Sequence, residues 1–365
     1  MAMAEGRQYE VSLVDAIGAR TRTIALEGAG LDGLSLEVRP VPDDDREHAM
    51  DPRVFEMARR RLSGATATPG INDVISMRER PNKESHAIDD GSVTERVALM
   101  NLGDRLIPLH IFEPQRSSTG SVAVLAYFHG GGFTVGNVGQ FRNPLRLIAQ
   151  LSGCVVTYTE YRLAPECPYP AGVEDCSGTV DWLCEHAKEL GIDPERIAVA
   201  GDSAGGSLSN AVAQLQAGRG RVKLVMEMYP LTDAGPVPAA WSYDLYPMRD
   251  EQRVEAKSRV DRFKNPGDSL AETYAMGSHE VTAGPLVSAL NCRDFSVFPR
   301  TVVITADYDY LRYQGELFAK RLLDAGVSVR AIRYAGCDHG FFETCGVLPQ
   351  VEDLCRVMAG ELSSI

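Results

Sequence analysis

The sequence predicts an α/β protein built on a mostly parallel, doubly wound sheet flanked by helices. From about residue 93 onward, short apolar runs alternate with longer segments of helical periodicity, and short loops connect them. The run at 122–128 is apolar throughout, as expected of a strand that is buried on both faces. These two observations favour parallel strands joined by crossover helices.

The expected elements begin with two paired strands, 97–101 and 107–112, around the turn Gly103-Asp104. Strands and helices then alternate along the rest of the chain. The further strands are expected at 122–128, 154–159, 197–200, 224–228, 302–305 and 327–334, and the helices at 141–151, 173–189, 314–325 and from 204 onward.

Two stretches interrupt the alternation and divide the chain into regions. Residues 1–92 are predicted to form an N-terminal extension and part of a cap, with a helix at 52–62, and residues 232–284 form a cap insertion with a charged helical segment at 249–263. An insertion at the carboxyl ends of parallel strands lies where ligands bind in such folds. The core domain then comprises 93–231 and 285–365. For residues 1–45, surface decoration or an oligomer contact is the alternative to a cap.

Composition narrows the function classes. The net charge is −13 without a basic run, which argues against binding of nucleic acid or of an anionic membrane surface. No apolar run approaches the ~18 residues of a membrane helix, and residues 1–10 lack the apolar core of a secretory signal. The eight cysteines show no CxxC spacing, so we expect free thiols in a cytoplasmic protein.

The segment 201–205 reads Gly-Asp-Ser-Ala-Gly and matches G-x-S-x-G, with Gly206 following. A predicted strand runs directly into it and a predicted helix leaves it. Such a strand–turn–helix needs small residues on both sides of the serine and lifts its hydroxyl above the sheet. Ser203 is therefore the candidate nucleophile. A phosphate-binding turn is the alternative, but no lysine follows as in a P-loop.

The segment 129–132 reads His-Gly-Gly-Gly and comes straight after the apolar strand at 122–128. Successive glycines let backbone N–H groups approach a substrate closely. We expect the N–H groups of Gly131, Gly132 and Ala204 to form an oxyanion hole, and His129 to be structural. A glycine-rich hinge without chemistry is the alternative.

Of the seven histidines, only His339 follows the last predicted strand, and it satisfies the chain order Ser, acid, His. The acid is expected in the loop after the strand at 302–305, where Asp307 and Asp309 both stand. The residues alone leave the two aspartates nearly equal. Such a triad needs no metal or cofactor.

These motifs together resemble the hormone-sensitive-lipase-like, bacterial family IV carboxylesterases of the α/β-hydrolase superfamily. The resemblance rests on the segments HGGGF at 129–133, YRLAPE at 161–166, GDSAGG at 201–206, DYDYLR at 307–312 and HGF at 339–341. It implies an eight-stranded sheet, a cap from the N-terminal region and the insertion, and Asp309 as the acid. A homodimer is consistent with it.

The expected function is that of a serine carboxylesterase acting on short-chain acyl esters, acetyl to about octanoyl, through an acyl-enzyme on Ser203. One alternative is an amide or N-acyl hydrolase resembling arylformamidases, because such enzymes share the elbow and the glycine-rich hole. The other is a non-catalytic ligand receptor on the same scaffold, resembling plant gibberellin receptors. Such receptors lose the triad histidine, whereas this chain has His339.

Overall fold

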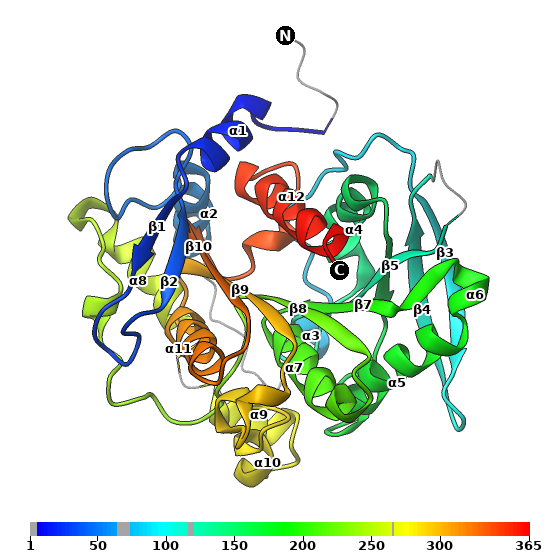
Figure 1. The fold of residues 1–365 in the computed structure, drawn as a ribbon. Coiled ribbons are helices and arrows are strands. Elements are labelled where there is room, and N and C mark those ends of the chain that lie inside the picture. Colours follow the sequence, from blue (N-terminus) through cyan, green and yellow to red (C-terminus); the bar gives the residue numbers. More distant parts are fainter. Residues whose placement is uncertain (1–5, 64–73, 116–119, 265) are drawn as a thin grey trace.

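In the part of the chain that the structure describes, one ten-stranded sheet carries helices on both faces (Figure 1). The computed structural model describes residues 6–63, 74–115, 120–264 and 266–365. The strands are β1 (Arg22–Ala25), β2 (Ser35–Arg39), β3 (Thr94–Asn101), β4 (Leu106–Glu113), β5 (Val122–Phe128), β6 (Val155–Thr159), β7 (Ile192–Asp202), β8 (Val222–Met228), β9 (Arg300–Tyr308) and β10 (Val329–Asp338).

The strand order is β1-β2-β10-β9-β8-β7-β5-β6-β4-β3. The central strands from β2 to β6 pair in parallel, and only β1 with β2, β4 with β6 and β3 with β4 pair antiparallel. The sheet is therefore mostly parallel, as predicted.

The expected count of eight strands is wrong, because the N-terminal region adds two. β2 pairs in parallel with β10, and β1 closes the edge antiparallel to β2. Leu36 and Val38 on β2 are buried, while the flanking Ser35 is exposed and Glu37 half-buried. This alternation suits a strand with one face against the core. Residues 22–25 and 35–39 of the N-terminal region thus belong to the sheet.

Helices cover the two faces of the sheet separately. One face carries α4 and α12, which pack on each other, with α1 against α12; the other face carries α5, α7 and α11 (Figure 1). The longer helices are α1 (Val11–Ala19), α2 (Pro52–Ser63), α4 (Val138–Ser152), α5 (Ala171–Glu185), α7 (Ala204–Gln216), α8 (Arg253–Asp261), α11 (Leu311–Asp324) and α12 (Pro349–Ser363). The short helices are α3 (Val74–Arg78), α6 (Ala187–Leu190), α9 (Gly267–Thr273) and α10 (His279–Ala283).

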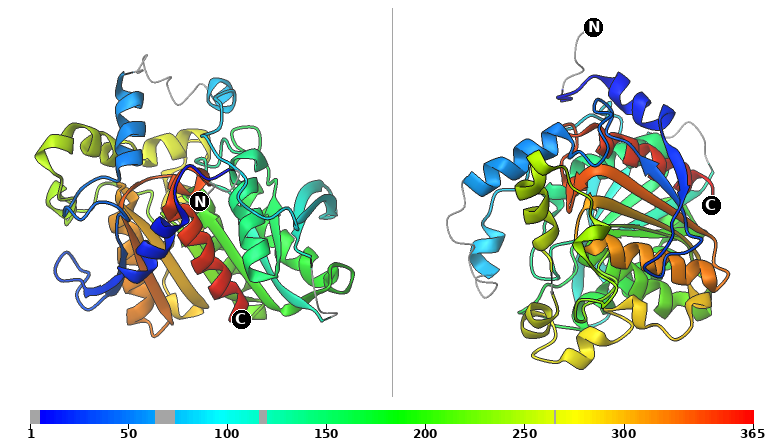
Figure 2. Two further views of the ribbon diagram at one scale, coloured as in Figure 1. Left: turned by 90° about the horizontal axis from the view of Figure 1, so that it is seen from above. Right: turned by 90° about the vertical axis from the view of Figure 1, so that its left-hand side faces the viewer.

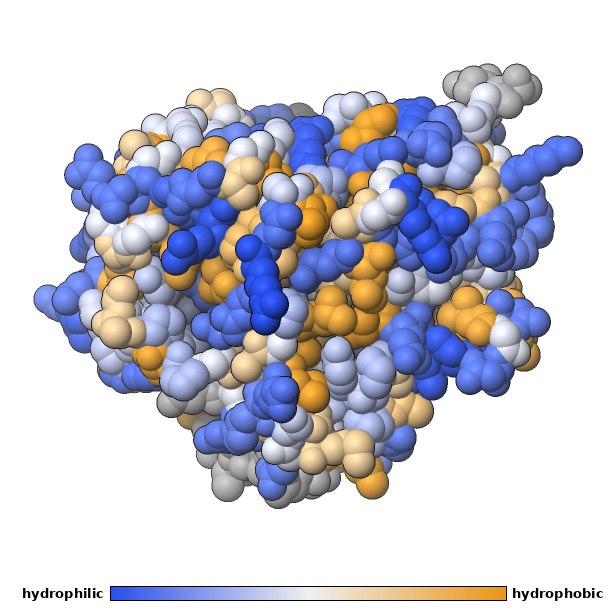
Figure 3. Space-filling model, turned by 60° about the horizontal axis from the view of Figure 1, so that its bottom comes forward, coloured by the Kyte–Doolittle hydropathy of each residue, from blue (hydrophilic) through white to orange (hydrophobic). Residues whose placement is uncertain are grey.

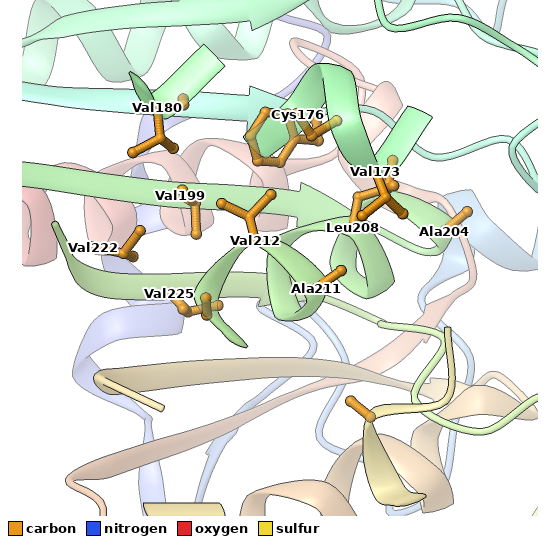
Figure 4. Close-up of a cluster of buried hydrophobic side chains, with 14 of the residues drawn as sticks. Val173, Cys176, Val180, Val199, Ala204, Leu208, Ala211, Val212, Val222 and Val225 are labelled. Atoms are coloured by element: carbon orange, nitrogen blue, oxygen red, sulfur yellow. The ribbon is translucent and has the colours of Figure 1, made fainter. Parts of the chain in front are cut away.

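Each face has its own apolar core. On the α7 side, Leu208 and Val212 of α7 pack over Val199 of β7 and Val225 of β8 (Figure 4). The face seen in Figure 3 is largely hydrophilic, with hydrophobic residues gathered near its middle. No helix in the described ranges is long and apolar enough to cross a membrane.

Helices α2, α3 and α8 gather at one end of the sheet, in both views of Figure 2. α2 matches the helix expected at 52–62. The helical segment expected at 249–263 forms as a 3-10 turn at Asp250–Gln252 followed by α8, and α2 packs against α8. The helix expected at 173–189 is broken at His186 into α5 and α6. The division of the chain into core and cap regions remains a prediction.

Candidate active site

Ser203 stands at a sharp bend between the end of β7 and the start of α7. Its backbone has φ 55° and ψ −119°, a strained conformation for a residue with a side chain. A Cβ on Gly205 would come within 2.0 Å of the carbonyl oxygen of Phe128, and one on Gly201 within 2.3 Å of the carbonyl oxygen of Gly205. Both positions therefore require glycine, which explains the spacing of the motif.

Three side chains from three separate loops meet at this bend. The Nε2 atom of His339 lies 2.9 Å from the Oγ atom of Ser203, and the Nδ1 atom of His339 lies 2.7 Å from the Oδ2 atom of Asp309. Asp309 is fully buried and His339 is 5 % exposed. The structure thus brings the predicted nucleophile, base and acid into one hydrogen-bonded chain.

The two aspartates of the acid loop face different partners. The Oδ1 atom of Asp309 accepts the N–H of Leu311 at 3.0 Å, which fixes the carboxylate toward His339. Asp307 instead accepts the N–H of Gly336 at 3.0 Å, and its carboxylate lies 3.8 Å from the guanidinium of Arg312. Asp307 therefore braces the strand that leads to His339 without touching the imidazole.

The glycine-rich loop after β5 presents free backbone donors. Gly131 and Gly132 have φ values of 119° and 61°, and a Cβ on Gly131 would lie 2.0 Å from the carbonyl oxygen of Val135. Among the described residues, the N–H groups of Gly131, Gly132 and Ala204 have no hydrogen-bond acceptor. Ala204 is also the first residue of α7, where the helix dipole favours negative charge.

Asp202 connects the bend to the glycine-rich loop, a role that the sequence reasoning did not assign. Its Oδ1 atom accepts the N–H of Gly130 and the hydroxyl of Tyr127, both at 2.7 Å. Burial raises the pKa of Asp202 to about 7, with the nearby carboxylate of Glu343 adding to the shift. The residue before the serine therefore fixes the position of the loop.

His129 packs against the same loop and has the structural place expected of it. It is fully buried, its ring stacks on Tyr161 at 4.4 Å and on Tyr158 at 5.3 Å, and its Nδ1 atom lies 2.7 Å from the carbonyl oxygen of Gly130. Burial lowers the pKa of His129 to about 4, so the imidazole is neutral. Tyr161 donates its hydroxyl to the His129 carbonyl at 2.8 Å.

Glu166 of the YRLAPE segment takes part in a surface ion pair. Its carboxylate binds the guanidinium of Arg78 on α3 through contacts of 2.6 and 2.8 Å, and these bonds lower its pKa to about 2. Arg78 also donates to the carbonyl oxygens of Thr134 and Ala164. The segment thus attaches α3 to the glycine-rich loop.

The insertion contributes contacts to His339 that the sequence did not reveal. The centre of the Phe263 ring, just after α8, lies 4.2 Å from that of the imidazole ring. The ring of Tyr229, which follows β8 and precedes the insertion, lies 4.8 Å from it. Arg259 of α8 forms an ion pair with Asp338, the residue before His339. An aromatic residue near a helix end was visible at 263, but nothing local indicated its partner.

Comparison with known proteins agrees with this architecture. A family model described as alpha/beta hydrolase fold matches residues 125–343. Carboxylesterase NlhH of Mycobacterium tuberculosis is 34% identical over 246 residues, covering 67% of this chain and 73% of that protein. Carboxylic ester hydrolase LipN of the same organism is 35% identical over 310 residues, covering 77% and 78%.

A solved structure adds to this agreement. The hyperthermophilic esterase from the archaeon Pyrobaculum calidifontis superposes with a TM-score of 0.69 at 26% identity, covering 87% of this chain and 98% of that one.

Proposed function

Because this chain belongs to the α/β-hydrolase fold family and is a carboxylic ester hydrolase, we propose that it is a serine esterase that hydrolyses short-chain acyl esters through an acyl-enzyme on Ser203. The observation that carries the proposal is the hydrogen-bonded chain from Ser203 through His339 to Asp309. The hormone-sensitive-lipase-like motifs at 129–133 and 201–206 support the same assignment.

The geometry suits acylation. The Oγ atom of Ser203 attacks the ester carbonyl carbon while the Nε2 atom of His339, 2.9 Å away, takes the hydroxyl proton. Asp309 keeps the other nitrogen, Nδ1, as the N–H donor and stabilises the imidazolium. The N–H groups of Gly131, Gly132 and Ala204 receive the negative charge on the carbonyl oxygen. His339 then protonates the departing alcohol, and the serine retains the acyl group.

Deacylation repeats the sequence with water. His339 removes a proton from the water molecule, and the resulting hydroxide equivalent attacks the acyl carbon. The second oxyanion occupies the same position, and its collapse returns the proton to Ser203 Oγ and releases the acid. Each proton lost by a nucleophile thus returns to a leaving oxygen through one imidazole.

A profile of p-nitrophenyl esters from acetyl to palmitoyl tests the proposal. We expect the highest kcat/KM at eight carbons or fewer and a covalent adduct of Ser203 with a fluorophosphonate probe. Ser203→Ala should lose both ester hydrolysis and labelling by the probe, and its circular dichroism spectrum should match that of the wild type. Failure of the probe to label Ser203, or turnover in the Ser203→Ala variant, would remove the acyl-enzyme. Faster hydrolysis of acyl anilides than of esters would favour the amide-hydrolase alternative.

A further inference from the structure

Cationic side chains gather around the end of α8, where Phe263 packs against the imidazole of His339. Arg259 lies on α8, Arg262 follows this helix, and Arg61 lies near the end of α2, which packs against α8. Arg259 is neutralised by its ion pair with Asp338. Among the residues that the structure describes, neither the Arg262 nor the Arg61 side chain forms a hydrogen bond or an ion pair.

One aromatic ring, that of Phe263, contacts both Arg262 and His339. The guanidinium carbon of Arg262 lies 4.7 Å from the centre of the Phe263 ring, and that ring lies 4.2 Å from the imidazole of His339. A ring face attracts the guanidinium but leaves its net charge unchanged. The N–H groups of Arg262 therefore remain available within a short distance of the predicted reaction centre.

Arg262 is exposed to solvent but lies close to other cationic groups. Burial lowers the pKa of Arg262 to about 10, and the charges of Arg61 and Arg259 add to this shift. The guanidinium is still charged at neutral pH, and a bound anion would offset its partial desolvation.

The unpaired positive charge of Arg262 and Arg61 contrasts with the net negative charge of the whole chain. The protein has 50 acidic residues against 37 lysines and arginines, so carboxylates are plentiful as partners. Most other arginines near the site do have them, as Arg78 has Glu166 and Arg333 has Glu316. Within the described residues, Arg262 and Arg61 have no ion-pair partner, and this points to the charge of a ligand.

We propose that the substrates of this esterase carry a carboxylate, which Arg262 binds with Arg61 behind it while the ester carbonyl lies against Ser203. A guanidinium binds a carboxylate through two parallel N–H···O bonds, which fixes orientation as well as charge. Monoesters of dicarboxylic acids are the simplest compounds with this chemistry. The proposal rests on the serine-esterase function argued above and specifies its substrate class.

A matched pair of substrates separates charge from size. Monoethyl adipate carries the carboxylate, and ethyl 6-amino-6-oxohexanoate replaces it with a neutral amide of the same shape. With the full chain at pH 7.5 and low salt, we expect kcat/KM for the carboxylate to exceed that for the amide about tenfold, as one charged hydrogen-bonding contact supplies. This ratio should fall as salt is added, because counterions screen exposed charges.

Three variants test the role of the guanidinium. Arg262→Gln should lower the ratio about tenfold, and Arg262→Lys should keep most of it because the charge remains. Arg293→Gln is the matched control, since Arg293 is exposed and, within the described residues, has no ion-pair partner; its ratio should equal that of the wild type. Thermal unfolding of each variant checks the fold.

Each outcome decides between the proposals. An unchanged ratio in Arg262→Gln, equal losses on both esters, or a wild-type preference for the amide would each overturn the carboxylate assignment alone. The esterase function would survive those results if p-nitrophenyl acetate is hydrolysed and Ser203 is labelled. If neither occurs, the esterase proposal fails, and the carboxylate proposal fails with it.

Discussion

Replacement of Asp309 by Asn removes a charge from a buried position and keeps the size of the side chain. The carboxylate now lies 2.7 Å from the Nδ1 atom of His339 and is inaccessible to solvent. If the new amide group donates an N–H to Nδ1, the imidazole must carry its proton on Nε2 instead. The nitrogen that faces Ser203 can then no longer accept the hydroxyl proton.

The size of the effect follows from the lost charge and the lost tautomer. Two unit charges about 4 Å apart attract by about 4 kcal/mol at an effective dielectric constant of about 20. At about 1.4 kcal/mol for each tenfold change in rate, loss of this attraction to the imidazolium lowers kcat about 10³-fold. The wrong tautomer brings the loss toward the ~10⁴-fold typical of triad acids.

The assay is steady-state hydrolysis of p-nitrophenyl acetate, with Asp307→Asn as the matched control. Asp307 binds the N–H of Gly336 at 3.0 Å, and an asparagine oxygen can accept the same bond. We expect the control to lose less than about tenfold, since no contact with His339 is broken. If Asp307→Asn costs more than Asp309→Asn, or if both cost the same, the assignment of the acid is refuted.

Three further predictions concern the loop, the core and the cap. Gly131→Ala places a Cβ against the carbonyl oxygen of Val135 and should lower kcat ~10²–10³-fold, measured on p-nitrophenyl acetate, because a misplaced N–H no longer meets the oxyanion; near-normal kcat would contradict this role. Burial raises the pKa of Glu227 from 4.5 to about 8, so its protonated form stabilises the fold fully below pH 4.5 and this stabilisation is lost as the pH rises to about 8. The unfolding free energy of Glu227→Gln minus that of wild type, measured in urea titrations, should therefore rise by about 4 kcal/mol from pH 5 to pH 8. A difference that does not change with pH would refute the shift. Phe263→Ala removes the ring beside His339 and should lower kcat about tenfold with little change in melting temperature, because the imidazole loses a packing contact; an unchanged kcat would show that the ring does not hold the imidazole.

Much of the fold was predictable because its signals are local. The apolar run at 122–128 is buried on both faces, so it needed no partner to be recognised, and β5 has those bounds. The bend at Ser203 and the loop with the glycines at 131 and 132 can be recognised from the sequence, because both segments need glycines that no other residue can replace. The candidate site depends on these segments.

The parts that sequence did not reveal depend on distant partners. β2 is only five residues long, and its place in the sheet depends on pairing with β10, which follows it by about 300 residues. The contact of Phe263 with His339 joins the insertion to the last loop, and no periodicity indicates such a meeting. The choice between Asp307 and Asp309 depended on which carboxylate turns toward the imidazole, a matter of backbone direction within one loop.

The pairing of β2 with β10 also affects how the chain folds during synthesis. β2 leaves the ribosome about 300 residues before β10, the strand that it pairs with, is made. Chains are made N-terminus first at about 5–20 residues per second, so the β2 edge stays open for tens of seconds. An unpaired edge invites pairing with other chains. Lower growth temperatures or added chaperones should therefore raise the yield of folded protein.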